Sequence, residues 1–425
     1  MILNVASASS LKGRILLPAS KSYSIRAFII AACGGTSHLI HPSNCEDALV
    51  AMKTAKSLGS KVQKNTEGYS IEADLKISSN KTFLVGESGT SLRFLLPLLP
   101  MTTQKAIVKG HGTLVGRPNA HLCQTLRDCG MNLKGTGPKE SVPLVYQGGA
   151  FKGGTIEIDG SLSSQFISAL LIAAPLLPVD SRIRIIGKEM VSVDYIVMTR
   201  QILEKAGIAV KRVSDREYWV KGHQTFKGLK NFKVPSDYGL AAFSMAAASI
   251  LSSKVVLAGH LKGDLVQSDG HILEFLTKMG VVFKKTNSAI AIEGPFALKG
   301  GTFSLKNCPD LVPIMAVLAL FAKGQTKLVD IVHARAKESD RISDVRSELL
   351  KVGADVKETS NALIITPQSS YKTGQLLDSH HDHRLAMAWT VLGMKIGCRV
   401  EGIESCRKSY PDFVKDMKIL GLSTR

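Results

Sequence analysis

Six stretches of the chain share one pattern, in which polar residues are followed at once by about ten small apolar residues. The apolar runs cover residues 25–32, 92–99, 166–177, 240–251, 312–322 and 385–394. Runs that are apolar on all sides predict helices buried in a core. Ser, Gly or Asp stands at each polar start, and these residue types favour the beginning of a helix. The pattern therefore predicts six buried helices with polar starts.

A second landmark recurs in step with the first. A glycine ends an amphipathic segment, and alternating apolar and polar residues follow, as expected of a strand hairpin. The glycines are about 70 residues apart, at Gly59, Gly130, Gly207, Gly280, Gly353 and Gly421. Two independent landmarks with one period predict six copies of a unit that contains a buried helix, an amphipathic helix and strands.

The sixth copy ends at residue 425, shortly after its glycine, so its last strands must come from elsewhere. The strand-like residues 1–17 are expected to complete it. This gives two lobes of three copies each, residues 1–19 with 234–425 and residues 20–233, with two chain crossings that favour a hinge. If the helix starts of each lobe point one way, six positive helix ends face one cleft and attract a multiply anionic ligand.

Composition excludes several classes of protein. The apolar runs are too short to span a bilayer, and the first residues lack the features of a secretory signal. The seven cysteines are scattered, which favours reduced thiols over a disulfide framework or a zinc site. The formal net charge of +19 is spread along the chain, without the basic stripe of a nucleic-acid-binding protein. We expect a cytoplasmic, monomeric protein that binds neither membrane nor nucleic acid.

The residues at the helix starts of the lobe formed by residues 20–233 are suited to anions. Lys21 and Arg26 flank the first start, where Ser22 or Ser24 is expected to cap the helix. Gly89 allows a close approach of backbone N–H groups to an anion, and Arg117 can bind phosphate or carboxylate with two parallel hydrogen bonds. The remaining candidates are neutral or aromatic, namely Ser163, Ser164, Gln165, Ser192 and Tyr195.

The lobe that contains residues 234–425 supplies the acids. Asp310 opens the fifth buried helix, and the segment from Arg335 to Arg341 carries five charges in seven residues. Helical spacing is expected to place Lys337 and Arg341 on one side with Glu338 adjacent, which keeps that carboxylate ionised unless burial opposes it. Arg384 and Lys408 add further cations, and a metal site at the nearby histidines is a weaker hypothesis than a phosphate site. The set indicates transfer of a group between two anionic small molecules by acid–base chemistry.

The chain resembles the 5-enolpyruvylshikimate-3-phosphate synthase family over essentially its whole length. The segments that carry the resemblance are Ser20-Lys-Ser-x-Ser-x-Arg26, Gly89-Thr-x-x-Arg93, Gly116-Arg-Pro118, Asp159-Gly-Ser-x-Ser-Ser-Gln-Phe166, Lys337-Glu-Ser-Asp-Arg341, Asp382-His-Arg384 and Lys408-Ser-Tyr-Pro-Asp412. The resemblance implies an α/β fold of two lobes, an inside-out α/β prism with three βαβαββ repeats per lobe and the active site between the lobes. It implies transfer of the enolpyruvyl group of phosphoenolpyruvate to the 5-hydroxyl of shikimate 3-phosphate, in the shikimate pathway to chorismate and aromatic amino acids, with no organic cofactor and no metal.

The resemblance also implies roles for individual residues. Residues expected to hold shikimate 3-phosphate are Lys21, Ser22, Arg26, Ser163, Ser164, Gln165, Ser192, Asp310, His333 and Lys337. Those expected to hold phosphoenolpyruvate are Lys21, Gly89, Arg117, Gln165, Arg341, Arg384 and Lys408. We assign Asp310 as the base towards the hydroxyl and Glu338 as the acid towards the methylene carbon, with Lys21 assisting.

Some positions depart from the family pattern. Glu87 and His333 stand where Asn is common, and Val193-Asp194 occupies a place where a Pro commonly precedes the tyrosine. The extra carboxylate of Glu87 falls near the phosphoenolpyruvate end. Gly89, rather than Ala, resembles the glyphosate-sensitive class, so we expect glyphosate to compete with phosphoenolpyruvate.

Three alternatives remain open at this point. UDP-N-acetylglucosamine 1-carboxyvinyltransferases share the fold, but they carry a reactive cysteine in the arginine-containing loop. Here residues 110–118 contain none, and Cys123 is expected inside the next helix. A nucleic-acid-binding or RNA-end-processing protein would fit the net charge but needs stacking aromatics. A catalytically inactive relative is disfavoured because Lys21, Asp310 and Glu338 are all present.

Overall fold

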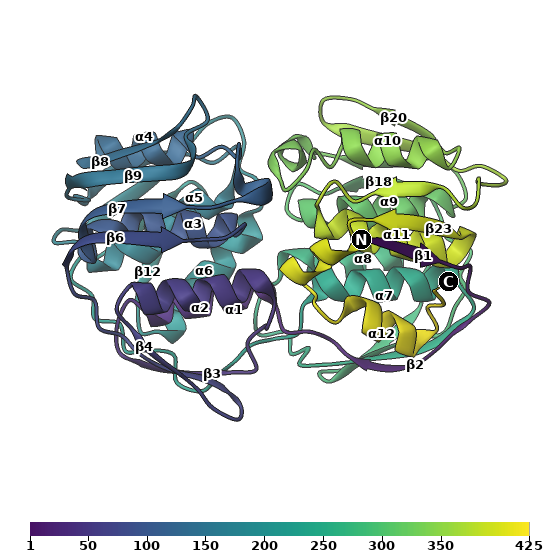
Figure 1. The fold of residues 1–425 in the computed structure, drawn as a ribbon, viewed down its shortest axis with the longest axis horizontal. Coiled ribbons are helices and arrows are strands. Elements are labelled where there is room, and N and C mark those ends of the chain that lie inside the picture. Colours follow the sequence, from purple (N-terminus) through teal and green to yellow (C-terminus); the bar gives the residue numbers. More distant parts are fainter. Residues whose placement is uncertain (425) are drawn as a thin grey trace. The chain divides into compact units, whose positions relative to one another are not determined.

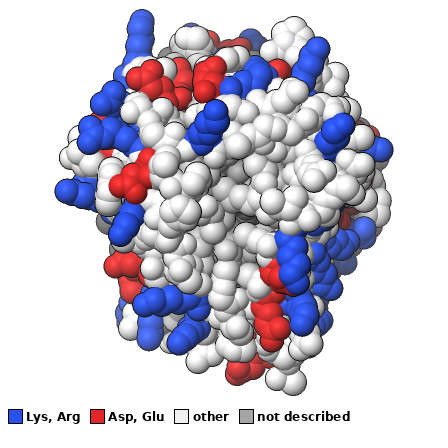
Figure 2. All heavy atoms as spheres, turned by 90° about the vertical axis from the view of Figure 1, so that its left-hand side faces the viewer, with Lys and Arg blue, Asp and Glu red and all other residues white. Residues whose placement is uncertain are grey.

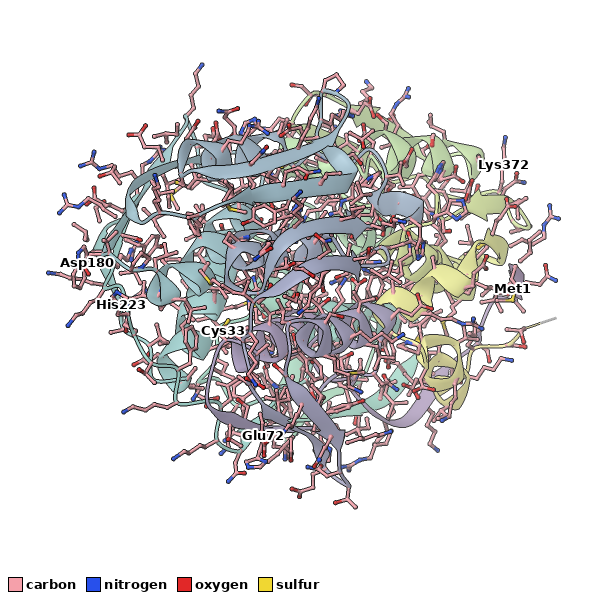
Figure 3. The ribbon with its side chains drawn as sticks, turned by 60° about the vertical axis from the view of Figure 1, so that its left-hand side comes forward. Met1, Cys33, Glu72, Asp180, His223 and Lys372 are labelled. Atoms are coloured by element: carbon pink, nitrogen blue, oxygen red, sulfur yellow. The ribbon has the colours of Figure 1, made fainter. Side chains whose placement is uncertain are left out.

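The computed structural model describes residues 1–424, which form two compact units (Figure 1). Unit 1 consists of Met1–Pro18 and Pro235–Arg425, and unit 2 consists of Ala19–Val234. None of the helices within residues 1–424 is both long and apolar enough to cross a bilayer. All seven cysteines are free thiols, and Cys33, just past the end of the first helix, is one of the buried ones (Figure 3).

Unit 2 contains three copies of a strand–helix pattern. Its helices are α1 (Lys21–Ala31), α2 (Glu46–Ser57), α3 (Gly89–Leu95), α4 (Ala120–Asp128), α5 (Ser164–Ala173) and α6 (Val193–Lys205), with 3₁₀ turns η1 (Leu96–Met101), η2 (Gly112–Leu114) and η3 (Ala174–Leu176). Its strands are β3 (Thr36–Ile40), β4 (Lys61–Lys64), β5 (Gly68–Glu72), β6 (Ser78–Leu84), β7 (Thr103–Lys109), β8 (Met131–Thr136), β9 (Ser141–Gly149), β10 (Gly154–Asp159), β11 (Ser181–Ile186), β12 (Val210–Ser214), β13 (Glu217–Val220) and β14 (Phe232–Lys233).

Unit 1 repeats the pattern. Its helices are α7 (Tyr238–Ile250), α8 (His271–Lys278), α9 (Val312–Leu320), α10 (Ser343–Lys351), α11 (His383–Ile396) and α12 (Phe413–Leu420), with 3₁₀ turns η4 (Ser268–Gly270), η5 (Pro309–Leu311), η6 (Val332–Ala336) and η7 (Ile403–Lys408). Its strands are β1 (Ile2–Val5), β2 (Leu11–Leu16), β15 (Ser253–Ala258), β16 (Phe283–Lys285), β17 (Ala289–Ile292), β18 (Thr302–Ser304), β19 (Thr326–Val329), β20 (Asp355–Glu358), β21 (Ala362–Thr366), β22 (Leu376–Asp378) and β23 (Cys398–Glu401).

Within residues 1–424 the strands form six sheets, one for each predicted copy. The orders are β14-β3-β5-β4, β6-β7-β9-β8 and β10-β11-β13-β12 in unit 2, and β16-β17-β15-β2, β18-β19-β21-β20 and β1-β23-β22 in unit 1. Every residue of α7 and of α9 is buried, as the uniformly apolar runs predict. The six helix-ending glycines all have positive φ, so the prediction of a left-handed residue at each helix end is confirmed.

The expectation that residues 1–17 complete the sixth copy is correct for only one of their two strands. Strand β1 pairs antiparallel with β23 and completes the sixth sheet, as predicted. Strand β2 does not join that sheet, because it pairs in parallel with β15 of the fourth copy. Conversely, β14 pairs in parallel with β3 of the first copy. The first and fourth copies thus exchange their leading strands, which a local sequence pattern cannot reveal because parallel pairing is set by tertiary topology.

Candidate active site

Asp310 lies at the centre of a buried cluster of charges in unit 1. It is part of η5, at the start of the fifth buried helix, and its side chain is 17% exposed. One carboxylate oxygen, Oδ1, lies 2.6 Å from Arg341 Nη1 and 3.5 Å from Lys337 Nζ. The other oxygen, Oδ2, lies 3.3 Å from Arg384 Nη2. Three cations around one carboxylate favour its ionised form, which is the form that accepts a proton.

Glu338 contacts the same arginine, but the local backbone is not as predicted. Its Oε2 lies 3.0 Å from Arg341 Nη2. The expected helical spacing of Lys337 and Arg341 is wrong, because η6 ends at Ala336 and α10 begins only at Ser343. Asp340 explains this, since its Oδ1 accepts hydrogen bonds from the backbone N–H groups of residues 342 and 343 and so starts a new helix. Lys337 and Arg341 still converge on Asp310 from this bend.

Arg341 and Arg384 join three helix starts of unit 1. Arg341 is fully buried, and its Nε lies 2.8 Å from Oδ2 of Asp382, the residue that caps α11. Arg384 donates from Nη1 to the carbonyl oxygen of Gly239 in the first turn of α7. Both arginines also contact the carboxylate of Asp310, which lies in η5. Burial lowers the pKa of Arg341, but Asp382, Asp310 and Glu338 outweigh this effect and raise it above its ordinary value.

Asp269 is a member of this cluster that the sequence analysis missed. It lies in η4, is 6% exposed, and its Oδ2 lies 3.2 Å from Arg384 Nη2. Arg384 therefore bridges two carboxylates, those of Asp269 and Asp310. Burial raises the pKa of Asp269 to about 7, with Arg384 opposing the change and Asp310 and Asp237 adding to it. No sequence signal singles out Asp269, because it precedes an ordinary amphipathic helix.

The raised pKa of Asp269 predicts how stability depends on pH. From its ordinary value of 3.8 up to about 7, the folded chain binds more protons at Asp269 than the unfolded chain does. The free energy of unfolding should therefore decrease as the pH rises through this window. Asp269→Asn cannot titrate, so between pH 4 and 8 its stability relative to wild type should improve by up to about 4 kcal/mol. Urea unfolding across this pH range measures the difference, and parallel stability curves would contradict the prediction.

His333 and Lys408 are both buried. His333 is 4% exposed, and neither ring nitrogen has a hydrogen-bond partner within the described residues 1–424. Burial lowers the pKa of His333 to about 3, and the charge of Lys337 adds to this effect. The ring is therefore neutral at neutral pH and can donate from one nitrogen and accept at the other. Lys408, in η7, donates from Nζ to the carbonyl oxygen of His381.

The metal hypothesis at the histidines receives no geometric support. His380 Nε2 lies 3.0 Å from Glu348 Oε1, and His380 Nδ1 lies 3.9 Å from Asp344 Oδ1. No group of three or more His, Cys, Asp and Glu side chains within residues 1–424 is arranged to hold a metal ion.

In unit 2, Lys21 stands at the first residue of α1 and pairs with Asp47 of α2. Its Nζ lies 3.1 Å from Asp47 Oδ2, and the two side chains are 12% and 13% exposed. The expected cap is wrong, because Ser20 caps the helix by accepting from the backbone N–H of Tyr23. Ser22 and Ser24 lie inside the helix instead, and Ser24 donates to the carbonyl oxygen of Ser20. Lys21 therefore projects from the first turn, where the helix end is positive.

Arg26 fastens α1 to α6. It is 1% exposed and donates to Thr199 Oγ1 at 2.9 Å and to the carbonyl oxygen of Tyr195 at 3.2 Å. Its guanidinium also lies over the Tyr195 ring, 5.6 Å from the centroid. Burial lowers the pKa of Arg26 to about 10, so it remains charged at neutral pH. Ser192, the residue before α6, is buried with φ of 56°, a conformation uncommon for serine that marks a constrained turn.

Arg93 connects the starts of α3 and α5. It donates from Nη1 to Gln165 Oε1 at 2.6 Å, and Gln165 Nε2 donates to Thr90 Oγ1 at 3.0 Å. Ser163 caps α5, and Ser164 is its first residue. Arg93 was visible in the sequence as part of a motif, but only the structure shows that it orients Gln165.

Gly89 and Arg117 lie against each other. Gly89 opens α3, which Ser88 caps. A Cβ atom at Gly89 would lie 3.0 Å from Arg117 Nη1, so the absence of a side chain lets the guanidinium approach the helix start. Arg117 itself is 7% exposed. The pair places a cation beside the start of a helix, which is a favourable arrangement for phosphate or carboxylate.

Solved structures with the same fold include enolpyruvyl transferases. An EPSP synthase from Acinetobacter baumannii aligns with a TM-score of 0.79 and 26% identity, covering 100% of this chain and 99% of that chain. The enolpyruvyl transferase NikO from Streptomyces tendae aligns with a TM-score of 0.77 over 100% of this chain and 98% of that chain, and at 14% identity it supports the fold alone. By fold, the chain belongs with the enolpyruvyl transferases.

Sequence comparison identifies the family to which the chain belongs within the enolpyruvyl transferases. The family model for EPSP synthase (3-phosphoshikimate 1-carboxyvinyltransferase) matches residues 5–417. A 3-phosphoshikimate 1-carboxyvinyltransferase from Korarchaeum cryptofilum is 36% identical, over 98% of both chains, and one from Clostridium perfringens is 35% identical over 98% of both. The chain belongs to the EPSP synthase family, as its motifs predicted.

The position of Cys123 and the distribution of surface charge test two of the alternatives, a UDP-N-acetylglucosamine 1-carboxyvinyltransferase and a nucleic-acid-binding protein. Cys123 is buried inside α4, as expected, and burial raises the pKa of its thiol, so it is not the reactive loop cysteine of the rival transferases. On the face drawn in Figure 2, lysines and arginines stand in separate groups around a broad uncharged area, interspersed with acidic residues. On this face, the distribution differs from the continuous basic stripe that is typical of nucleic-acid-binding proteins.

Proposed function

We propose that this chain transfers the enolpyruvyl group of phosphoenolpyruvate to the 5-hydroxyl of shikimate 3-phosphate and releases inorganic phosphate. The observation that carries the proposal is the cluster around Asp310, where the carboxylates of Asp310 and Glu338 meet three cations, which are Lys337, Arg341 and Arg384. A carboxylate that accepts a proton, a second acid and cations for phosphate are what this reaction needs. Membership of the EPSP synthase family supports the same choice.

In the proposed mechanism, Asp310 accepts the proton of the 5-hydroxyl as the oxygen attacks carbon 2 of phosphoenolpyruvate. Glu338 delivers a proton to the methylene carbon, which becomes a methyl group, and Lys21 assists this transfer. The tetrahedral adduct then loses phosphate, which takes the proton held by Asp310. Glu338 takes back a proton from the methyl group as the double bond re-forms, so both carboxyl groups return to their starting states. The surrounding cations stabilise the charge on the adduct and on the leaving phosphate.

The binding roles are assigned from the same residues. We propose that one set holds shikimate 3-phosphate, namely Lys21, Ser22, Arg26, Ser163, Ser164, Gln165, Ser192, Asp310, His333 and Lys337. A second set holds phosphoenolpyruvate, namely Lys21, Gly89, Arg117, Gln165, Arg341, Arg384 and Lys408.

Phosphate release from the purified protein tests the function directly. Phosphoenolpyruvate is supplied alone, with shikimate 3-phosphate, and with UDP-N-acetylglucosamine. We expect phosphate only when shikimate 3-phosphate is present. Release with the nucleotide sugar instead would overturn the substrate, and no release with either acceptor would overturn the activity.

Gly89→Ala should weaken phosphoenolpyruvate binding and glyphosate inhibition together. The added methyl group would press on the Arg117 guanidinium and displace it. We expect the KM for phosphoenolpyruvate and the inhibition constant of glyphosate to rise by about ten- to a hundredfold, since small misplacements have effects of this size. Steady-state kinetics measure both constants. Gly263→Ala, where no atom lies within 4 Å of the added Cβ, is the matched control and should leave both unchanged.

We further propose that the protein works in the shikimate pathway as a cytoplasmic monomer. The proposal rests on family membership and on the absence of an evident membrane-spanning helix within residues 1–424. Light scattering coupled to size-exclusion chromatography should give the mass of one chain, 45.7 kDa. A mass twice as large would contradict the monomer.

A further inference from the structure

The extra carboxylate of Glu87 is bound by a neighbouring loop. Glu87 follows β6, in the turn that leads into α3, and it is half-buried. Its Oε2 accepts two hydrogen bonds from Thr113 of η2, one from the backbone N–H and one from the side-chain hydroxyl, both at 2.7 Å. Hydrogen bonds to an ionised acceptor at this length are among the stronger ones in proteins.

The loop is shaped to receive this carboxylate. Gly112, next to Thr113, has φ of 56°, and a Cβ atom there would overlap the carboxylate of Glu87. The backbones are also joined nearby, because the N–H of His111 donates to the carbonyl oxygen of Gly86 at 3.0 Å. The segments 85–89 and 111–117 are thus held together by backbone and side-chain hydrogen bonds.

These two segments carry Gly89 and Arg117. Arg117 lies four residues after Thr113, and its N–H donates to the carbonyl oxygen of Leu114 within η2. Its guanidinium rests against Gly89, two residues after Glu87. The Glu87–Thr113 contact therefore lies between the segments that must keep a cation beside the start of α3.

We propose that Glu87 is a positioning residue that fixes the Arg117 loop on the start of α3 and thereby sets the affinity for the phosphoenolpyruvate anion. The inference rests on the proposed function and deepens it. It assigns Glu87 a mechanical role, through its two hydrogen bonds to Thr113. The competing explanation is electrostatic, in which the negative charge of Glu87 simply opposes the anion.

Three variants separate these explanations. Glu87→Gln keeps an oxygen that can accept from Thr113 but removes the charge, whereas Glu87→Ala removes the contact as well. Thr113→Val removes only the hydroxyl. The matched control is Glu72→Ala on β5 (Figure 3), where the side chain is 64% exposed.

If Glu87 positions the Arg117 loop, Glu87→Ala should raise the KM for phosphoenolpyruvate by about tenfold or more. The kcat and the KM for shikimate 3-phosphate should stay nearly unchanged. Glu87→Gln should restore most of the affinity, Thr113→Val should lie between, and Glu72→Ala should match wild type. The double variant Glu87→Ala with Thr113→Val should be no worse than Glu87→Ala alone, because both remove one contact. A lowered KM for phosphoenolpyruvate in both Glu87→Ala and Glu87→Gln would overturn the positioning role and support the electrostatic explanation. Equal changes in KM for both substrates would overturn it as well and would indicate general destabilisation.

Binding of inorganic phosphate, measured by calorimetry, tests the inference without turnover. The order of affinities should be wild type, Glu87→Gln, Thr113→Val and Glu87→Ala. If wild type releases no phosphate from phosphoenolpyruvate, the proposed function fails, while this order still supports the role of Glu87. Equal phosphate affinities in all four proteins would overturn it.

Discussion

Arg341→Met should destabilise the chain by about 3–5 kcal/mol at neutral pH, as breaking one partner of a buried ion pair does. The arginine is fully buried and lies within 3.0 Å of three carboxylates, those of Asp310, Glu338 and Asp382. Methionine fills much of the same volume but leaves these carboxylates without their shared cation. Urea unfolding followed by circular dichroism measures the loss.

The pH dependence and two controls identify the cause. Without Arg341, protonation relieves the carboxylates, so the deficit should shrink as pH falls towards about 4. Asp382→Asn in the Arg341→Met background should recover part of the loss, because it removes a buried charge and still offers an oxygen to cap α11. Arg407→Met, at an exposed position of η7, should leave stability nearly unchanged. A pH-independent deficit would point to packing instead of charge.

The repeat architecture was predictable because it depends on local signals. Apolar runs with polar starts locate the buried helices, and glycine at a left-handed position locates each helix end. These features depend on residues close together in the sequence, and the structure has one sheet for each predicted copy. The exchange of β2 and β14 was missed because two strands with similar patterns can occupy equivalent places in different sheets.

The candidate site was predictable for residues within motifs and unpredictable for their partners. One motif named Glu338 and Arg341, the polar start of the fifth buried helix named Asp310, and the structure places both carboxylates against Arg341. Asp269 and Asp47 belong to no motif, and they reach the cations Arg384 and Lys21 only through tertiary packing. The expected helix through residues 337–341 failed because helical spacing was assumed for a charge-rich segment that Asp340 instead divides.

Glu338→Gln should reduce turnover by about a hundred- to ten-thousandfold, the contribution expected of a general acid. Glutamine keeps an oxygen that can accept from Arg341 Nη2, so the cluster around Asp310 should keep its packing. It cannot deliver a proton to the methylene carbon, so the addition step slows while both substrates still bind. Phosphate release in single-turnover and steady-state experiments gives kcat, and calorimetry gives the dissociation constants, which should change less than about threefold.

Glu348→Gln is the matched control, because Glu348 is another buried glutamate of unit 1 that pairs with a cation. It is 2% exposed, its Oε2 lies 2.7 Å from Lys351 Nζ, and it also accepts from the backbone N–H of Asp378. Its loss should lower stability and leave kcat nearly unchanged. If Glu338→Gln and Glu348→Gln both lower stability and neither lowers kcat, Glu338 is a structural partner of Arg341 and the proton must come from another group. A large loss of kcat confined to Glu338→Gln would place the proton transfer at this carboxylate, because the two variants make the same chemical change in two glutamates that each pair with a cation of unit 1.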